Sequence, residues 1–553
     1  MVDVVLAVHA AATEQDSAAV CAALMKLVMV ASAAVHKKDL VKRDALLAVS
    51  TAQYASLVQN VVRYTDEKLC LAVLSFFCLA GDTPSLADKL AAAKAPAAIA
   101  HILKLHRVSS ETLVHSSLLA LRSFSLSPVS RQAVLAEPTL PELVASVMLE
   151  YPSDLSVQGQ SCSCLANLAT GSHEDKARLV ASGTVVAALQ ILNPTCSPRI
   201  ENVKVVGRCC QFLRNVSVQS EQAQAVISQA LPELGALVLH DGFARDVAIV
   251  ESVFFILLAL LESTQQCSNR TIEHVESHRD QIGALQSCAR LHATHPSVSL
   301  AYLKLIVKLC ELSTRQPTVQ ASAGKDGAVE LAVRMLESFP DFEHQEYACM
   351  LIRKLCFEAD NRVLLRGCGG VPALVSSIRR QAARESVQQA FLALANASFD
   401  DTKTKELAGR GEAVPAILDA MKKNRGSPAI QEHGCRVLRN LADHCKLVQE
   451  EQVQGDTIST VIIALIVYTG QKGVVEQALS VLLNLRGNPD ADVKIQTAHA
   501  EDTLLRIREM YSSDKLLCEQ AQALMYGKGP SVDRAEPKAT KPKGRGLFGK
   551  HKK

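Results

Sequence analysis

Apolar residues recur along this chain in short helical runs, and a polar residue interrupts the apolar middle of many of them. In CRVLRNLADHCKLV, residues 435–448, the interruption is the pair Arg439 and Asn440. Apolar spacing of this kind predicts amphipathic helices, and the strict alternation typical of strands is scarce. An asparagine occupies the same place in four other runs: SCLANLATG (Asn167), QFLRNVSVQ (Asn215), LALANASFD (Asn396) and VLLNLRGNP (Asn484).

This place, which we name the ladder position, recurs at a nearly constant spacing. Other runs carry a different residue there, namely Phe76, Ser123, Lys308 and Lys354. Neighbouring ladder positions lie 42–48 residues apart, and the 93-residue gap from 215 to 308 is two steps, with FILLALLES near Ala259 between them. A fixed period of this length predicts stacked helical repeats, each of which buries its apolar face only against its neighbours.

Residues 397–445 show how one repeat is built. TKTKELAGRG reads as a short helix ended by glycine, a common C-terminal stop. AVPAILDAMKKN reads as a second helix, with Pro415 near its start, where a missing N–H costs little. GSPAI makes a turn, and QEHGCRVLRNLADHC is a longer third helix. The pattern therefore predicts a three-helix repeat.

The runs CGGVPALVSSI and GRGEAVPAILDAM, each followed by a helix with the LRNLA pattern, resemble armadillo repeats. The resemblance covers roughly residues 15–527 and implies an all-α, right-handed superhelical solenoid of armadillo repeats. We expect an array over residues 1–527 of about eleven to twelve units with atypical end caps, and a disordered basic tail over residues 528–553.

The same resemblance implies a binding groove. In armadillo arrays the third helices line a concave groove, where their asparagines hydrogen-bond the backbone of an extended peptide. An amide suits this role because it offers both a donor and an acceptor. Residues four or seven positions earlier share its helix face. The candidate groove residues are Asn167, Arg208, Gln211, Asn215, Lys304, Lys308, Lys354, Gln389, Asn396, His433, Arg436, Asn440, Gln477 and Asn484. The structural alternative is that each asparagine caps or bridges the neighbouring repeat.

This face is polar and basic, so we expect its protein partner to present an extended acidic or mixed segment. Importin-α-type armadillo proteins pair each groove asparagine with a tryptophan, and this chain has none. A basic face would also repel a basic signal peptide. Reception of nuclear-import signals is therefore not expected.

Charge is distributed unevenly along the chain. Seven of the 59 Lys and Arg residues lie in residues 537–553, which hold no acidic residue. The rest of the chain has 52 Lys and Arg against 56 Asp and Glu, so its net charge is about −4. Nucleic-acid binding by the body is not expected on these grounds. The basic tail includes Leu547 and Phe548 among its cations. Three interpretations stay open: contact with an acidic protein or lipid surface, a nuclear-localisation-like signal, or a tail that is simply solvated.

The seventeen cysteines are scattered on apolar faces and form no CxxC, which predicts reduced core residues in a reducing compartment. The N-terminus lacks the basic lead of a secretory signal, and VFFILLALL and VIIALIVY are too short to span a bilayer. We expect a cytoplasmic protein without an integral membrane segment, with nuclear or ciliary locations left open.

No motif predicts a cofactor, a metal or a catalytic site. HVESH (274–278) places two histidines four apart, but Val275 stands where an HExxH motif needs Glu, so a solvated loop or short helix between repeats is expected. GRGLFGK (544–550) has no strand before it and no helix after it to hold a phosphate. The sequence thus predicts a non-catalytic protein-interaction scaffold. An adaptor for cytoskeletal or ciliary assemblies, or a clasp for a chaperone or small GTPase, is the alternative, and an enzyme comes last.

Overall fold

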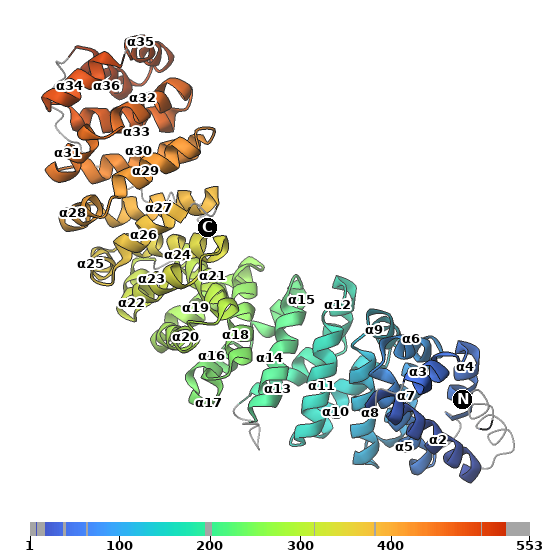
Figure 1. Cartoon of the computed structure of the whole chain (residues 1–553). Helices are drawn as coiled ribbons and strands as arrows, with labels where there is room; N and C mark the ends of the chain where they lie inside the picture. The colour runs from blue at the N-terminus through green and yellow to red at the C-terminus, as the bar shows by residue number, and fades with distance from the viewer. Residues whose placement is uncertain are drawn as a thin grey trace, which may run out of the picture. The chain divides into compact units, whose positions relative to one another are not determined.

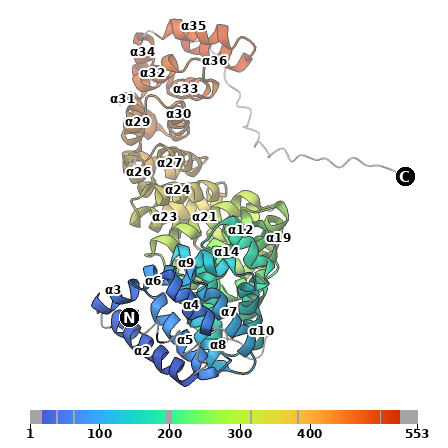
Figure 2. The same cartoon turned by 90° about the vertical axis from the view of Figure 1, so that its right-hand side faces the viewer.

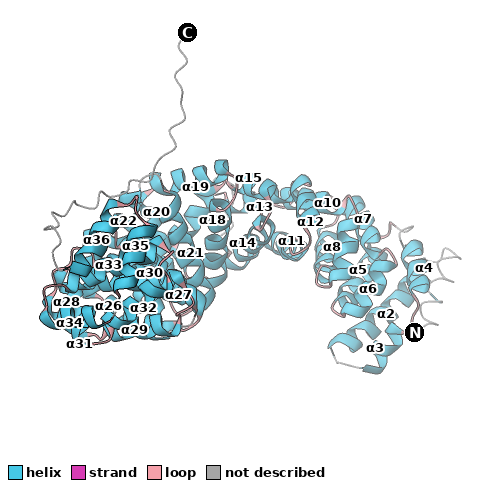
Figure 3. Ribbon diagram, turned by 90° about the horizontal axis from the view of Figure 1, so that it is seen from above, coloured by secondary structure: helices cyan, strands magenta, loops and turns pink. Residues whose placement is uncertain are grey.

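The computed structural model describes residues 7, 17–36, 40–61, 65–193, 202–313, 316–380, 383–498 and 500–526. Within these ranges the chain forms 35 helices and no strand (Figure 3). The fold-class prediction of an all-α repeat protein is confirmed. The predicted basic tail, residues 528–553, lies outside the described ranges. None of the described helices combines the length and the apolar character that crossing a bilayer requires.

The chain divides into two compact units, residues 1–339 and 340–553, and each is considered by itself. In both units the long third helices follow one another in a stack, each packed against the next (Figure 1). Those of the first unit are α2 (Ser17–His36), α5 (Glu67–Gly81), α8 (Glu111–Phe124), α11 (Leu155–Leu168), α14 (Val203–Ser217), α18 (Val247–Leu261) and α21 (Pro296–Leu312). Those of the second unit are α24 (Phe342–Leu355), α27 (Arg384–Ala397), α30 (Pro428–Ala442), α33 (Lys472–Leu485) and α36 (Lys515–Tyr526).

A first and a second helix connect each third helix to the next one. The first helices are α3 (Leu40–Leu47), α6 (Pro84–Ala92), α9 (Pro128–Ala136), α12 (His173–Ala181), α15 (Glu221–Ile227), α19 (Gln265–Ser277), α22 (Gln316–Lys325), α25 (Ala359–Gly367), α28 (Thr402–Arg410), α31 (Lys446–Gln454) and α34 (Pro489–Thr497). The second helices are α4 (Thr51–Val61), α7 (Ala95–His106), α10 (Leu140–Glu150), α13 (Thr184–Leu192), α16 (Leu231–Leu239), α20 (Arg279–Leu291), α23 (Ala328–Ser338), α26 (Gly370–Arg380), α29 (Ala413–Lys423), α32 (Thr457–Val467) and α35 (Glu501–Met510). In the second unit, α26, α29 and α32 form a column beside α27, α30 and α33 (Figure 2). One repeat carries an extra turn of helix, α17 (Asp241–Ala244).

Local sequence signals explain where the helices begin. Many third helices start after a short polar residue whose side chain accepts from a backbone N–H of the first turn, as Asp154, Asp246 and Ser427 do. Such caps satisfy donors that a helix start leaves open. In some repeats the corner between the first and second helices contains a left-handed residue, which glycine supplies without strain at Gly183, with φ 74°. Glu412 takes the same role before α29 with φ 59°.

The core consists of small and branched apolar side chains between successive helices. Twelve of the sixteen cysteines in the described ranges are buried, as predicted for core residues. Burial raises the pKa of the Cys164, Cys349 and Cys435 thiols to about 12, so these groups stay protonated and unreactive.

The predicted repeat over residues 397–445 corresponds to α28, α29 and α30. The interpretation of HVESH needs a correction. The segment does not lie between repeats, because its first four residues belong to α19, a regular first helix whose Cys267, Ile272 and Val275 are buried in the core.

Candidate protein-binding face

The five ladder asparagines all lie in the last turn of a third helix and are half-buried. In each, the side-chain amide turns toward the preceding third helix. Four of them donate from Nδ2 to a backbone carbonyl of that helix: Asn215 to Ala166 at 2.9 Å, Asn396 to Arg353 at 3.0 Å, Asn440 to Ala395 at 3.0 Å and Asn484 to Arg439 at 3.1 Å. The geometry is the same each time, because the acceptor is the residue just before the preceding ladder position.

Asn167 makes the equivalent bond through a relay. Its Nδ2 donates to Ser125 Oγ at 2.9 Å, and that hydroxyl donates to the Arg122 carbonyl at 2.6 Å. Ser125 follows the last residue of α8. The relay therefore ends, like the direct bonds, in the C-terminal turn of the preceding third helix.

All five acceptor carbonyls belong to the last four residues of their helix, where carbonyls begin to lack a partner further along the same helix. Two of them, those of Arg122 and Arg439, also accept from the backbone N–H of Ser125 and Asp443, which follow the helix end. Each ladder asparagine thus caps its predecessor and ties two repeats together. In the chain without a partner, these amides therefore act as the structural alternative describes: each one bridges to the neighbouring repeat. One N–H of each amide is therefore already used, so the predicted role in holding a peptide would depend on the remaining N–H and on Oδ1.

The oxygen side of most ladder amides stays open. Within the described residues, Oδ1 makes no hydrogen bond in Asn167, Asn215, Asn396 or Asn484. Asn440 differs because its Oδ1 accepts from Arg439, with Nη2 at 2.9 Å and Nε at 3.2 Å.

The companion residues in the second unit are more enclosed than an open groove wall requires. Gln389 Oε1 accepts from Arg353 Nη1 at 2.9 Å, and Arg436 Nη2 lies 3.0 Å from Glu432 Oε1. Lys354 is half-buried and already interacts within the fold. Gln477 is only 9% exposed, so its predicted place on an open wall is not supported.

His433 lies half-buried seven residues before Asn440, and its Nδ1 is buried without a hydrogen-bond partner. Burial, followed by the positive charges of Arg436 and Arg353, lowers the pKa of His433 to about 4. The imidazole is therefore neutral at physiological pH, and the positive charge of this face comes from arginine and lysine.

In the first unit, Gln211 is exposed, while Arg208, Lys304 and Lys308 are half-buried. Arg208 lies over Gly159 of α11, where an added Cβ would stand 2.9 Å from Arg208 Nη1. The missing side chain leaves room for the guanidinium on the third-helix face.

The list of candidate groove residues left out two arginines that stand directly before a ladder asparagine, Arg214 and Arg439. The Arg214 guanidinium lies 4.1 Å from the Phe255 ring centroid and 3.2 Å from Glu251 Oε1. Burial lowers the pKa of Arg439, its counterpart in α30. The signal was the repeated triplet LRN in QFLRNVSVQ and CRVLRNLADHC.

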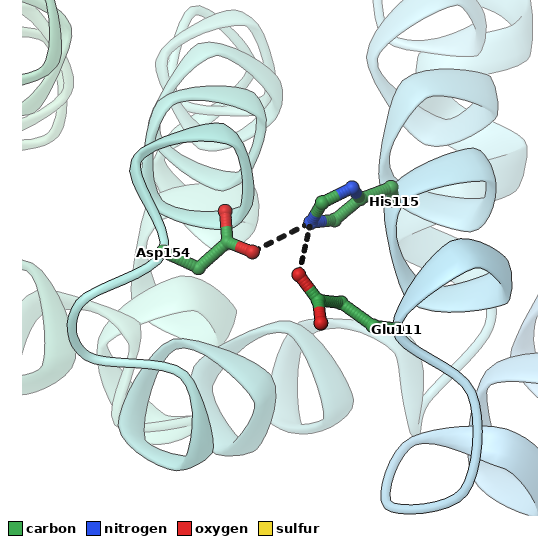
Figure 4. A group of neighbouring side chains, drawn as sticks. All are labelled: Glu111, His115 and Asp154. Carbon is green, nitrogen blue, oxygen red and sulfur yellow. Dashed lines mark hydrogen bonds and ion pairs between the residues drawn. The ribbon is translucent and has the colours of Figure 1, made fainter.

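The described residues contain one group of three side chains that could hold a metal ion: Glu111, His115 and Asp154 (Figure 4). His115 Nε2 lies 2.8 Å from Asp154 Oδ2 and 3.9 Å from Glu111 Oε1. The other oxygen of Asp154 caps α11. The hydrogen bond between His115 and Asp154 already joins two repeats, and Glu111 is largely exposed, so the geometry of the group has a structural explanation.

The chain matches no known family model, and no curated protein matches it either. Solved structures do resemble it. An engineered protein aligns with 78% of this chain and 99% of its own, at 18% identity and a TM-score of 0.60. A structure from work on the interaction between cadherin and beta-catenin aligns with 94% of this chain and 99% of its own, at 14% identity and a TM-score of 0.66. That neighbour is beta-catenin, an armadillo solenoid, so the fold of this chain is armadillo-like.

Proposed function

We propose that this chain is a non-catalytic protein-interaction scaffold whose third-helix face, defined by the ladder asparagines and their companions, holds an extended acidic or mixed segment of a partner protein. The observation that carries the proposal is the recurrence of a ladder amide in successive repeats of each unit, at Asn167 and Asn215 in the first and at Asn396, Asn440 and Asn484 in the second. Four of these amides keep an unbonded oxygen. A regular series of acceptors suits the N–H groups of an extended chain, whatever its sequence.

Two further points support this reading. Cations lie on this face in each unit, Arg208 and Lys308 in the first and Arg436 in the second, and they would favour carboxylates on the bound segment. The beta-catenin neighbour comes from a study of its interaction with another protein, cadherin. A closer resemblance of residues 411–445 and 518–525 to armadillo-repeat-containing protein six is not supported, because no curated protein matches the chain.

A test must separate binding from folding. Alanine at the ladder asparagines would remove bonds between repeats, so it confounds the two. Arg208→Gln, Lys308→Gln and Arg436→Gln together remove charge from the third-helix face with little change in shape. The matched control removes three exposed cations elsewhere, through Arg178→Gln, Arg245→Gln and Arg379→Gln, each of which forms one surface ion pair.

The probe is a fluorescein-labelled extended peptide of Glu, Gly and Ser, with a Lys-for-Glu version for comparison, followed by fluorescence anisotropy. We expect the acidic peptide to bind saturably, and the face variant to bind it about tenfold more weakly, with a shallower dependence on salt. Equal binding by the face variant and the control would reject the proposal. Cytoskeletal or ciliary adaptors and clasps for globular partners remain the alternative roles, since a clasp would hold a folded domain and not the peptide.

A further inference from the structure

One second helix carries an outward face unlike that of its neighbour. In α29 the exposed positions are Pro415, Asp419 and Lys423, which is ordinary for a solvated helix. At the same four-residue spacing, α32 exposes Ser459, Ile463 and Val467.

The apolar character of this face is substantial. Ile463 is 45% exposed, Val467 is 61% exposed, and Ile466 beside them is 49% exposed. Single exposed apolar residues are normal on protein surfaces, but a contiguous group on one helix face marks a contact surface.

A cavity of about 120 Å³ lies between α29 and α32, beside this stripe. Met421, Thr460 and Ala464 line its inner part, and Ile463 and Val467 form one edge. A dry cavity of about 150 Å³ in another protein accommodates benzene, so this volume suits one aliphatic or small aromatic side chain.

The walls of the cavity are held in place by hydrogen bonds within the repeat pair. Tyr468 Oη donates to the Arg425 carbonyl at 2.5 Å, and Gln431 Nε2 donates to the Met421 carbonyl at 2.9 Å. A pocket that exists before binding needs little reorganisation to accept a side chain.

The rim of the cavity carries one positive charge that no acidic side chain of the described residues pairs with. Lys422 lies there, 2.9 Å from Asp456, together with Arg425, which is exposed and forms no ion pair within the described residues. This charge argues against the basic residues 537–553 of the same chain as the occupant. A second copy would bring the same cations against this rim. A partner with carboxylates beside an apolar side chain fits both the floor and the rim.

We propose that this groove between α29 and α32 is a docking surface, separate from the third-helix face, for a short protein segment in which an aliphatic or aromatic side chain is flanked by carboxylates. The apolar side chain fills the cavity and covers Ile463 and Val467. A carboxylate then pairs with Arg425.

The test uses the full chain and a fluorescein-labelled peptide with Leu and Phe four residues apart among Glu residues, measured by anisotropy. We expect saturable binding that weakens about tenfold in Ile463→Ser/Val467→Ser and again in Arg425→Glu. Val186→Ser in α13 is the matched control, because Val186 is a 52% exposed outward residue of another second helix. The peptide with Lys in place of Glu should not bind.

Three outcomes would overturn the proposal. One is unchanged affinity in both the Ile463→Ser/Val467→Ser and Arg425→Glu variants, each of which alters only exposed positions. The other is concentration-dependent dimerisation in sedimentation that the serine variant abolishes, which would assign the groove to a second copy. Loss of binding in the Arg208/Lys308/Arg436→Gln variant instead would place this peptide on the third-helix face.

Discussion

Two stacks of third helices in this molecule are held together by different chemistry. In the second unit, α24, α27, α30 and α33 are joined by three successive amide-to-carbonyl bonds from Asn396, Asn440 and Asn484. In the first unit, α5 and α8 carry Phe76 and Ser123 at the ladder position and meet through aromatic rings. Phe77 lies 6.2 Å from Phe76 and 6.0 Å from Phe124, ring centroid to centroid, and all three rings are fully buried.

The difference teaches how one repeat spacing can be kept by two means. Burial of aromatic rings stabilises strongly, and most of that free energy comes from removing apolar area from water, which does not depend on direction. A hydrogen bond from a side-chain amide adds less free energy, yet it fixes which carbonyl faces which side chain. The ladder asparagines also stay half-buried, so the amide stack keeps polar atoms on the face where we propose that a partner binds, while the aromatic stack buries its ladder residues.

The largest effect is expected from a substitution that disrupts the aromatic stack. Phe77→Ala should destabilise the surrounding repeats by about 3–5 kcal/mol, because it removes a fully buried ring and leaves a cavity. Hydrogen exchange should show faster opening of α5 and α8. Leu126→Ala, at a 57% exposed side chain just after α8, is the control and should change exchange little. Equal exchange in both variants would mean that the rings do not hold this stack.

A smaller effect is expected in the amide stack. Asn440→Ala should cost about 1–2 kcal/mol, because the Ala395 carbonyl loses its donor from α30 and Arg439 loses an acceptor. The measurement is hydrogen exchange at the C-terminal turns of α27 and α30. Asn424→Ala is the matched control, since Asn424 Nδ2 donates to the Ala420 carbonyl of its own repeat. If the two variants behave alike, the bond between repeats adds nothing beyond local capping.

The comparison also marks what the sequence could and could not predict. The ladder spacing and the three-helix repeat could be predicted from apolar periodicity, because that periodicity reflects the local geometry of each helix. The direction of each amide did not, because it depends on how far one repeat is shifted against the next. For the same reason the burial of Gln477 and the Arg353–Gln389 bond were not foreseen. The arginines before Asn215 and Asn440 could have been found from the LRN triplet.

The smallest effect concerns pH and the face of α30. His433 has a pKa of about 4 in the folded chain, below the ordinary value of 6.5, because burial and nearby arginines disfavour its charged form. Above pH 6.5 the imidazole is neutral in both states and adds no pH dependence. As the pH falls from about 6.5 to about 4, the unfolded chain takes up the proton first, so the second unit loses stability.

Because the ring is partly hydrated, we expect this loss to be only about 0.5–1 kcal/mol. Urea unfolding of the second unit at pH 7 and pH 4.5 should show it, and His433→Gln should remove it, while His173→Gln at an exposed site in the first unit should not. A histidine NMR titration gives the pKa directly. A value near 6.5 would contradict the enclosed geometry. A rise in this pKa when an acidic peptide binds would place the peptide's carboxylates near Arg436 and Arg353, because an anion there offsets the charges that keep the imidazole neutral.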